Sequence, residues 1–280
     1  MRVINEGDIY NALYKSILDA GVKLPTDVKE AIVSAKKSST GLSNKVLSSI
    51  VENLDCAEKG CIPMCQDTGM VLLFVEIGRE LSLNEINLEE VINKSIKDAY
   101  ADGSFRKSVV LDPLNGRENS KNNLPAVIYY DFIPGDKLKI SGVLKGFGSE
   151  NCSKVFMLKP TEGRERVIEV VVETIKSAGG APCPPTVLGI GIGGTMDYAA
   201  KLSKKALLRE LDDINSDPYY RDLENDMLTE LNKLNIGPGG LGGGVTTLGV
   251  KIEHYPTHIA ALPVAVSVNC WADRKVLVEI

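Results

Sequence analysis

Hydrophobic residues in the first hundred positions recur mostly at helical spacing. Apolar side chains appear every three or four residues between Val3 and Leu18, with Lys and Glu on the intervening faces. The same spacing returns in three further segments, Val28–Ala35, Leu42–Leu54 and Leu88–Ala99. Because this period matches the α-helical turn, the pattern predicts a helical N-terminal layer over about residues 1–100. A loop at Cys56–Gly69 and a strand at Met70–Ile77 interrupt that layer.

The rest of the chain mixes strands and helices. Two alternating runs, Ala126–Ile133 and Lys137–Leu144, flank Pro134-Gly135-Asp136, which predicts a β-hairpin. Further helices are expected at Thr161–Ser177, Thr195–Leu208 and Pro218–Leu234, and further strands at Thr186–Ile192, Thr246–Glu253 and Ile259–Val268. The apolar end, Val276–Ile280, is expected to pack against this chain or a partner. No linker divides the sequence, so we expect one mixed α/β (α+β) domain over residues 1–280, with mixed sheets flanked by helices.

The composition disfavours some classes of partner and indicates a cellular location. The chain has 280 residues, 44% of them hydrophobic, which suffices for a substantial core. A net charge of -5 argues against nucleic acid or an anionic membrane as a partner. The sequence shows neither a signal peptide nor an apolar run of membrane-spanning length. Six cysteines in such a chain are expected to be reduced thiols or metal ligands, which fits a cytoplasmic location.

Three cysteines carry the clearest chemical signal. Cys65, Cys183 and Cys270 each lie in a short segment of glycine, proline, small and polar residues. Thiolates are the usual ligands of iron-sulfur clusters, and such loops let the backbone approach a bulky inorganic group, so the pattern predicts an iron-sulfur site. Three ligands would leave one iron open to act as a Lewis acid. Taken singly, each segment also fits a structural cysteine, and the spacings of Cys56 and Cys61 fit neither a ferredoxin nor a zinc motif.

Polar residues beside these cysteines are candidates for binding a small ligand. Gln66 and Asp67 follow the first cysteine and can fan out around one molecule, although a simple turn is the alternative. His258 precedes the third cysteine by a strand's length and is therefore a candidate for the same site. Arg106 and Lys145 are candidate carboxylate binders, with a solvated surface charge as the alternative for both, and this alternative is the preferred interpretation of Lys145.

A glycine motif supports a competing interpretation. Gly189, Gly191 and Gly194 satisfy the dinucleotide-binding pattern G-x-G-x-x-G. The surrounding sequence does not fit a nucleotide-binding unit. No second strand is predicted after the helix, and no acidic residue stands at the end of a predicted strand. We expect these glycines to let a helix pack closely on the sheet. The run Gly237–Gly244 lacks a phosphate-binding Lys-Ser or Lys-Thr and is expected to be a flexible or tightly turned connection.

Together, five segments resemble a known family. They are Pro63–Gly69, Lys145–Asn151, Ala181–Pro185 with Gly193-Gly194-Thr195, Asn235–Gly244 and Pro256–Arg274. This set, spread over essentially the whole chain, is similar to the α subunit of class I, iron-sulfur-dependent fumarate hydratase. The resemblance implies an iron-sulfur hydro-lyase α-type domain in which Cys65, Cys183 and Cys270 bind a [4Fe-4S] cluster with one open iron. Cys56, Cys61 and Cys152 match no ligand position.

The resemblance also implies roles for other residues and a partner. Gln66, Asp67, Arg106, Gly148 and His258 would surround a bound dicarboxylate, and the reaction would be reversible hydration of fumarate to malate. Asp67 would transfer a proton, while His258 and Gln66 would orient the substrate. Single-chain relatives carry a further C-terminal half, so a separate β subunit is expected to complete the site in a hetero-oligomer. Phe147 departs from the glycine that many relatives carry, but leaves Gly148 available.

Other functions predict different observations. The α subunit of tartrate dehydratase is a close relative, and turnover of malate and tartrate would separate the two. A non-catalytic cluster-binding interaction subunit would show no effect of substrate on its cluster. A nucleotide-dependent dehydrogenase would bind a nicotinamide cofactor without iron.

Overall fold

The computed structural model describes residues 2–280, which form two compact units. Unit 1 contains the chain up to Leu24 together with Asn53–Phe147 and Arg274–Ile280, and unit 2 contains Pro25–Glu52 and Gly148–Asp273. Both units combine a mixed sheet with helices, so the predicted mixed α/β class is confirmed. The expectation of one domain over residues 1–280 stays a prediction.

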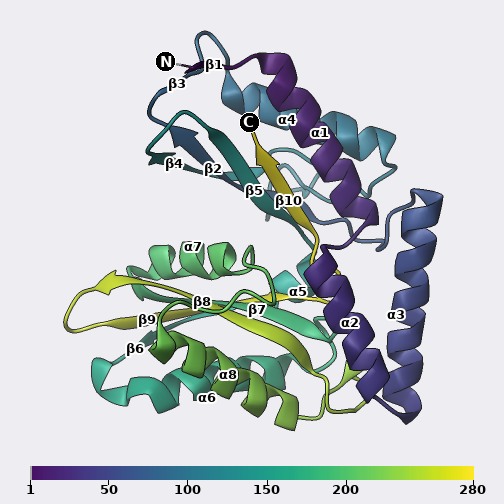
Figure 1. The fold of residues 1–280 in the computed structure, drawn as a ribbon, viewed down its shortest axis with the longest axis vertical. Helices are drawn as coiled ribbons and strands as arrows, with labels where there is room; N and C mark the ends of the chain where they lie inside the picture. Colours follow the sequence, from purple (N-terminus) through teal and green to yellow (C-terminus); the bar gives the residue numbers. More distant parts are fainter. Residues whose placement is uncertain (1) are drawn as a thin grey trace. The chain divides into compact units, whose positions relative to one another are not determined.

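Unit 1 is built on a sheet of strand order β10-β5-β2-β4. Its strands are β2 (Met70–Gly78), β4 (Val127–Ile133), β5 (Leu138–Lys145) and β10 (Lys275–Glu279). Helices α1 (Glu6–Val22) and α4 (Leu88–Asp102) lie side by side over this sheet, and their apolar faces form the core with it (Figure 1). The short strands β1 (Arg2–Val3) and β3 (Leu81–Ser82) pair in parallel. The apolar C-terminal strand pairs with β5, so it packs against its own chain.

The predicted β-hairpin is wrong. Strands β4 and β5 both exist, but β2 lies between them, parallel to β4 and antiparallel to β5. The nine residues of β2 are mostly buried, and Leu73 pairs with Ile128 on one side and Gly142 on the other. A continuous apolar strand gains most from burial on both faces, so it occupies the centre of the sheet and separates its sequence neighbours.

Unit 2 contains a second sheet, of strand order β6-β9-β7-β8. Its strands are β6 (Lys154–Leu158), β7 (Thr186–Gly194), β8 (Thr247–Thr257) and β9 (Leu262–Asn269). Helix α7 (Met196–Ala206) covers one face, and α6 (Gly163–Ala178) and α8 (Pro218–Lys233) cover the other (Figure 1). The unit also contains α2 (Thr26–Ser38), while α3 (Gly41–Gly60) and the short α5 (Phe147–Glu150) contribute residues to both units. Single 3-10 turns occur at Pro160–Glu162 and Pro238–Gly240.

Two glycines of β7 let α7 lie directly on the strand. A Cβ at Gly189 would stand 2.1 Å from the carbonyl oxygen of Ser203, and one at Gly191 would stand 2.0 Å from that of Ala199. No side chain fits at such distances. The expectation that the glycines of G-x-G-x-x-G serve helix packing is therefore confirmed for these two positions.

Gly191→Ala is expected to destabilise the protein by about 2 kcal/mol, because the added methyl forces α7 away from the strand. Urea unfolding followed by circular dichroism would measure this change. Gly7→Ala is the matched control, since beyond the neighbouring residues and backbone of α1 no described atom lies within 4 Å of the position its Cβ would take. Equal midpoints for Gly191→Ala and the wild type would contradict the prediction.

Candidate active site

The loop of the first cysteine is held in unit 1 by its buried neighbours. Met64 is buried, its amide donates to the carbonyl of Gly21 (3.1 Å), and its own carbonyl accepts from the Asn53 side chain (2.8 Å). The following Cys65 is partly exposed and Gln66 is exposed. The loop therefore presents these two side chains on a fixed backbone.

The far end of this loop is fixed at Gly69. Its φ is +91°, and a Cβ there would stand 2.3 Å from the carbonyl oxygen of Lys145, so only glycine fits. The Gly69 carbonyl accepts hydrogen bonds from the Tyr100 hydroxyl (2.9 Å) and the Asn123 amide group (3.1 Å). Both donors are fully buried. Burial is the main reason that the pKa of Tyr100 lies above its ordinary value; Arg274 lowers this pKa and Asp67 raises it.

Asp67 lies against the end of β5. Its Oδ2 accepts the backbone N–H of Phe147 at 2.9 Å. The same oxygen and Nη2 of Arg274 each lie 3.4 Å from the point where a Cβ on Gly146 would stand. The interpretation of Lys145 as a solvated charge is wrong: the residue is 3% exposed, because it ends a strand buried between β2 and β10.

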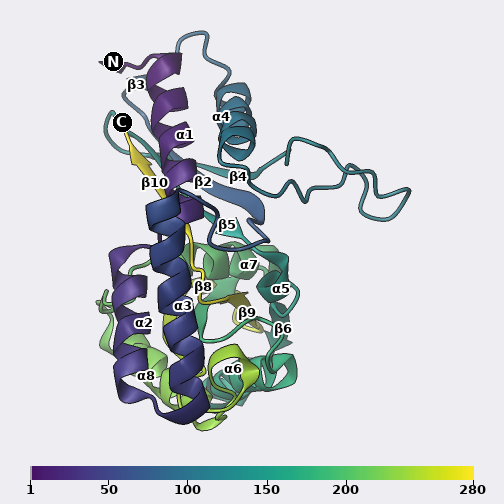
Figure 2. The same ribbon diagram turned by 90° about the vertical axis from the view of Figure 1, so that its right-hand side faces the viewer.

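Arg106 is exposed on a long loop that joins α4 to β4 and extends away from the body of unit 1 (Figure 2). The loop is anchored before and after this residue. Phe105 is buried against Tyr100 in an edge-to-face contact, and Asn123 accepts the amide hydrogen of Ser108 at 2.8 Å. Because Asn123 also binds Gly69, this one side chain connects the Arg106 loop to the Cys65 loop.

The other two predicted cysteines lie together in unit 2. Cys183 precedes β7 and Cys270 follows β9, and these two strand ends pair through Val187 and Asn269. The backbone N–H of Trp271 donates to the Cys183 carbonyl at 3.4 Å. Cys183 is exposed and has a φ of +53°, a conformation that non-glycine residues adopt at a cost. Such strain is concentrated at functional sites.

The glycine-rich run after α8 packs against this corner. The amide of Gly239 donates to the carbonyl of Pro184 at 2.7 Å. A Cβ on Gly240 would stand 2.6 Å from the Cα of Gly180. Of the two forms expected for this run, the structure shows the tightly turned one, and its glycines allow the backbone to reach the cysteine segment.

His258 lies at the opposite end of the same sheet. It follows the end of β8, which pairs with the end of β7 through Thr257 and Gly194. Figure 1 shows the connection from β8 to β9 projecting at one tip of the sheet, whereas the two cysteines belong to the start of β7 and the end of β9. The nine residues of β7 span about 25 Å. His258 is exposed there, and its Nδ1 accepts the Ala260 amide at 3.2 Å.

Gly148 belongs to α5 and is exposed in unit 2. Its carbonyl accepts a hydrogen bond from the Cys152 thiol at 3.5 Å. Two residues further, Glu150 forms an ion pair with Lys204 of α7. Burial lowers the pKa of Lys204 and Glu150 opposes this shift, so the pair joins α5 to α7 beside Gly148.

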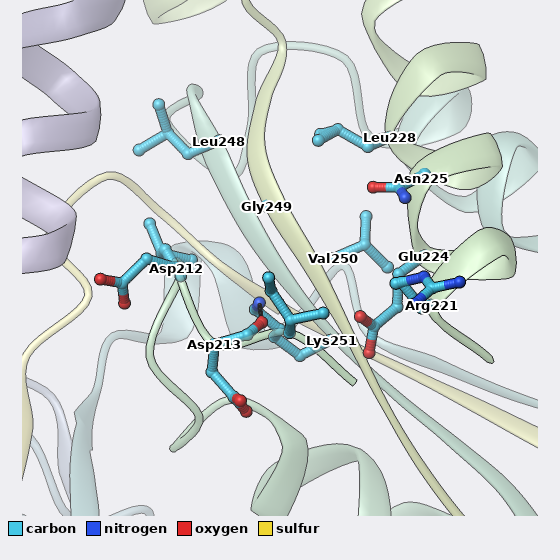
Figure 3. A pocket seen from close by; sticks show the side chains of 12 residues that line it. Asp212, Asp213, Arg221, Glu224, Asn225, Leu228, Leu248, Gly249, Val250 and Lys251 are labelled. Atoms are coloured by element: carbon cyan, nitrogen blue, oxygen red, sulfur yellow. Dashed lines mark hydrogen bonds between the residues drawn. The ribbon is translucent and has the colours of Figure 1, made fainter. Parts of the chain in front are cut away.

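A hollow of about 280 Å³ lies elsewhere on unit 2, beside the middle of β8 (Figure 3). Its polar lining includes Asp213, Glu224 and Lys251. These groups serve the fold, since Glu224 pairs with Arg209 at 2.8 Å and Lys251 donates to the Asp213 carbonyl. No predicted site residue lines this hollow.

The described structure leaves cluster ligation open. All six cysteines lie within residues 2–280, and none of them forms a disulfide. Over the same residues, no three His, Cys, Asp or Glu side chains form a ready metal-binding group. Cys65 belongs to unit 1 and Cys183 and Cys270 to unit 2, so ligation by all three stays a prediction. No helix in this range is long and apolar enough to span a bilayer.

Comparison with known proteins identifies the family. A family model described as "Fumarate hydratase (Fumerase)" matches residues 10–279. The chain belongs to this family. Among relatives, it is 44% identical to "Putative L(+)-tartrate dehydratase subunit alpha" of Methanocaldococcus jannaschii, covering 94% of each chain. It is 34% identical to "Putative fumarate hydratase class I" of Geobacillus stearothermophilus, over 97% of this chain but only 55% of that protein.

A third relative is "L(+)-tartrate dehydratase subunit alpha" of Escherichia coli. The two chains are 32% identical over a region that covers 90% of this chain and 84% of the relative. The names of these relatives share one reaction class, the addition or removal of water. The chain is a hydro-lyase of the α-subunit type, and the resemblance seen in the sequence is confirmed at this level.

Three residues that lie next to the candidate site could not be recognised from the sequence alone. Tyr100 and Asn123 hold Gly69, and Arg274 lies beside Asp67. Asn123 has a φ of +62°. Asparagine tolerates this conformation better than most residues, so the residue type was a weak signal of a special backbone position. Tyr100 fits the apolar face of a helix, and Arg274 follows a polar turn, so neither stands out before the chain is folded.

Proposed function

We propose that this chain is the α subunit of an iron-sulfur hydro-lyase that reversibly adds water to fumarate to give malate. The observation that carries the proposal is the cysteine corner of unit 2. Two strand ends bring Cys183 and Cys270 into neighbouring loops, and Cys183 is exposed in a strained conformation. A buried structural cysteine requires neither the exposure nor the strain.

The donor set fits a cluster. Three thiols, Cys65, Cys183 and Cys270, are exposed or partly exposed, outside disulfides, and set in loops rather than in the core. These residues would hold a [4Fe-4S] cluster with one iron open. When bound, such a cluster supplies a Lewis acid that makes a hydroxyl group a better leaving group.

The chain's other residues would bind the substrate and move a proton. Asp67 is our candidate for proton transfer, since its carboxylate is fixed by Phe147 and stays partly exposed. Gln66 and Arg106 are exposed donors in unit 1 that would orient a dicarboxylate and pair with one of its carboxylates. Gly148 would add a backbone contact.

His258 lies too far from Cys183 and Cys270 to act at their site within one chain. A strand of about 25 Å separates its end of the sheet from Cys183 and Cys270, and no side chain spans that distance. A role for His258 at the site of these cysteines therefore needs the His258 of a second copy. We infer that the enzyme contains at least two α subunits, each of which contributes this histidine to its neighbour.

Mixed assemblies test that inference. Chains with His258→Ala and chains with Cys183→Ser are each expected to be inactive. Co-expressed with the partner subunit, the two variants should recover about a quarter of wild-type activity, because half of the two-fold pairs are mixed and each mixed pair has one intact site. Mixtures that stay as inactive as the separate variants would show that each copy supplies its own histidine or that His258 has no role.

The partner and compartment complete the proposal. Relatives named as subunit alpha imply a separate partner, and we propose a β subunit that supplies the remaining substrate-binding and basic groups in a hetero-oligomer. Reduced thiols and a cluster fit the cytoplasm, and hydration of fumarate is a step of the tricarboxylic acid cycle.

Tartrate is the second candidate substrate. The relative that is 44% identical over nearly the whole chain is named for tartrate dehydration, which favours this alternative. Turnover of malate and tartrate by the reconstituted pair of subunits would decide between them. A malate preference of at least about tenfold would support the proposed substrate, and the reverse preference would replace it.

Electron paramagnetic resonance tests the cluster. The chain is reconstituted anaerobically, mildly oxidised and measured with and without excess iron. A three-iron signal that disappears on iron addition would support one labile iron. A fully ligated cluster that does not respond to substrate would instead support a non-catalytic interaction subunit. If no cluster forms on the chain alone, the same measurement on the co-expressed subunits becomes the test.

A further inference from the structure

Arg274 is a buried arginine whose charge the fold does not explain. It is 2% exposed, and its Nε and Nη1 atoms have no hydrogen-bond partner within the described residues. Its backbone is fixed, since its carbonyl accepts the Leu144 amide at 3.2 Å. A guanidinium taken out of water normally stabilises a fold only when its donors are paired.

Arg209 in unit 2 shows what a structural arginine looks like in this protein. Its guanidinium donates to Asp213 (2.7 Å), Glu224 (2.8 Å) and the Ile252 carbonyl (3.0 Å). Arg274 has no comparable set of partners, although it is more deeply buried. Its presence therefore points to a role other than joining elements of the fold.

Asp67 is the carboxylate that the structure places beside Arg274. Nη2 of Arg274 and Oδ2 of Asp67 each lie 3.4 Å from the position that a Cβ on Gly146 would take, so the two atoms are no more than about 7 Å apart. The preceding carboxylate, Asp273, instead accepts a hydrogen bond from the side chain of Asn269. The Phe147 amide thus holds the Asp67 carboxylate, and the buried guanidinium lies near enough to attract its negative charge.

We propose that Arg274 is a positioning residue, which fixes the orientation of the Asp67 carboxylate for proton transfer. The inference rests on the proposed role of Asp67. The attraction of the nearby guanidinium would restrain rotation of the carboxylate and keep Oδ2 on the Phe147 amide, which leaves the other oxygen available to the reactants.

The test uses the assembled enzyme with its partner subunit. Arg274→Gln and Arg274→Lys should lower kcat about 100-fold and about 10-fold, respectively, because a misoriented catalytic group costs rate. KM should change by less than about threefold, since Arg274 does not act on substrate binding. Arg209→Lys is the control for a structural arginine and should leave kcat unchanged.

A double-mutant cycle with Asp67→Asn decides whether Arg274 acts through Asp67. Arg274→Gln should add less than about threefold to the loss in an Asp67→Asn background, because both changes remove the same oriented group. Losses that multiply, a rise in KM without a change in kcat, or full activity of Asp67→Asn would each overturn the inference.

A readout independent of activity separates this inference from the proposed function. Hydrogen exchange of the Phe147 amide, followed by mass spectrometry of a peptide spanning residues 143–150, should be faster in Arg274→Gln and approach the rate in Asp67→Asn. This measurement holds even if the wild-type complex has no hydro-lyase activity, in which case only the proposed function fails. If Arg274→Gln does not fold, Arg274→Lys carries the same comparison. Unchanged exchange in all folded variants would overturn the positioning role.

Discussion

Asp67→Asn is expected to lower turnover about 1,000-fold, which is the usual scale for loss of a proton-transfer group. The amide has nearly the same shape as the carboxylate and can still accept the Phe147 N–H, so the loop should keep its conformation. What is lost is the basicity of the oxygen that faces the reactants. Cluster content should stay normal, because Asp67 is no proposed ligand.

Two measurements on the assembled enzyme check this prediction. Turnover is followed by the absorbance of fumarate, and cluster content by iron and sulfide analysis. Asp136→Asn, in the connection between β4 and β5 of the same unit, is the matched control and should behave like the wild type. Full activity of Asp67→Asn would remove Asp67 from the mechanism, and loss of iron in the variant would make it a residue of the cluster site.

Cys183→Ser is expected to abolish activity and most of the bound iron. A serine hydroxyl is a harder donor than a thiolate and remains protonated at neutral pH, so it is a poor replacement ligand for an iron-sulfur cluster. The apoprotein should nevertheless fold, since the Cys183 side chain is exposed and contributes little to the core. Iron content, the visible absorbance of the cluster and thermal unfolding together distinguish a lost ligand from a lost fold.

Cys56→Ser provides the control for this experiment. Cys56 is also exposed, but it lies within α3 and matches no proposed ligand position. Its replacement should leave iron and turnover unchanged. If Cys183→Ser retains a full cluster, the three-cysteine assignment is wrong, whatever the activity of the variant.

Local sequence patterns were sufficient for most elements. Helices α1 to α4 appear where apolar residues recur at helical spacing, and β2 appears as the expected apolar run. Pairing was harder to predict. The hairpin of β4 and β5 failed because strand partners are chosen by the burial of the whole sheet, and β2 comes from a distant part of the chain. The same insertion explains why Lys145 is buried.

The sequence by itself determined the family, through short segments whose residue types suit thiolate ligation and carboxylate binding. Only the tertiary structure showed that Cys183 and Cys270 meet at one end of a sheet while His258 lies at the other, since strand direction and order set these positions. The tertiary structure also showed that Arg274 lies near Asp67 and that Asn123 forms a hydrogen bond with Gly69. The residues of each pair are far apart in the chain, so no local sequence pattern determines that they come together. They do so only when separate strands and loops pack against one another in the folded protein.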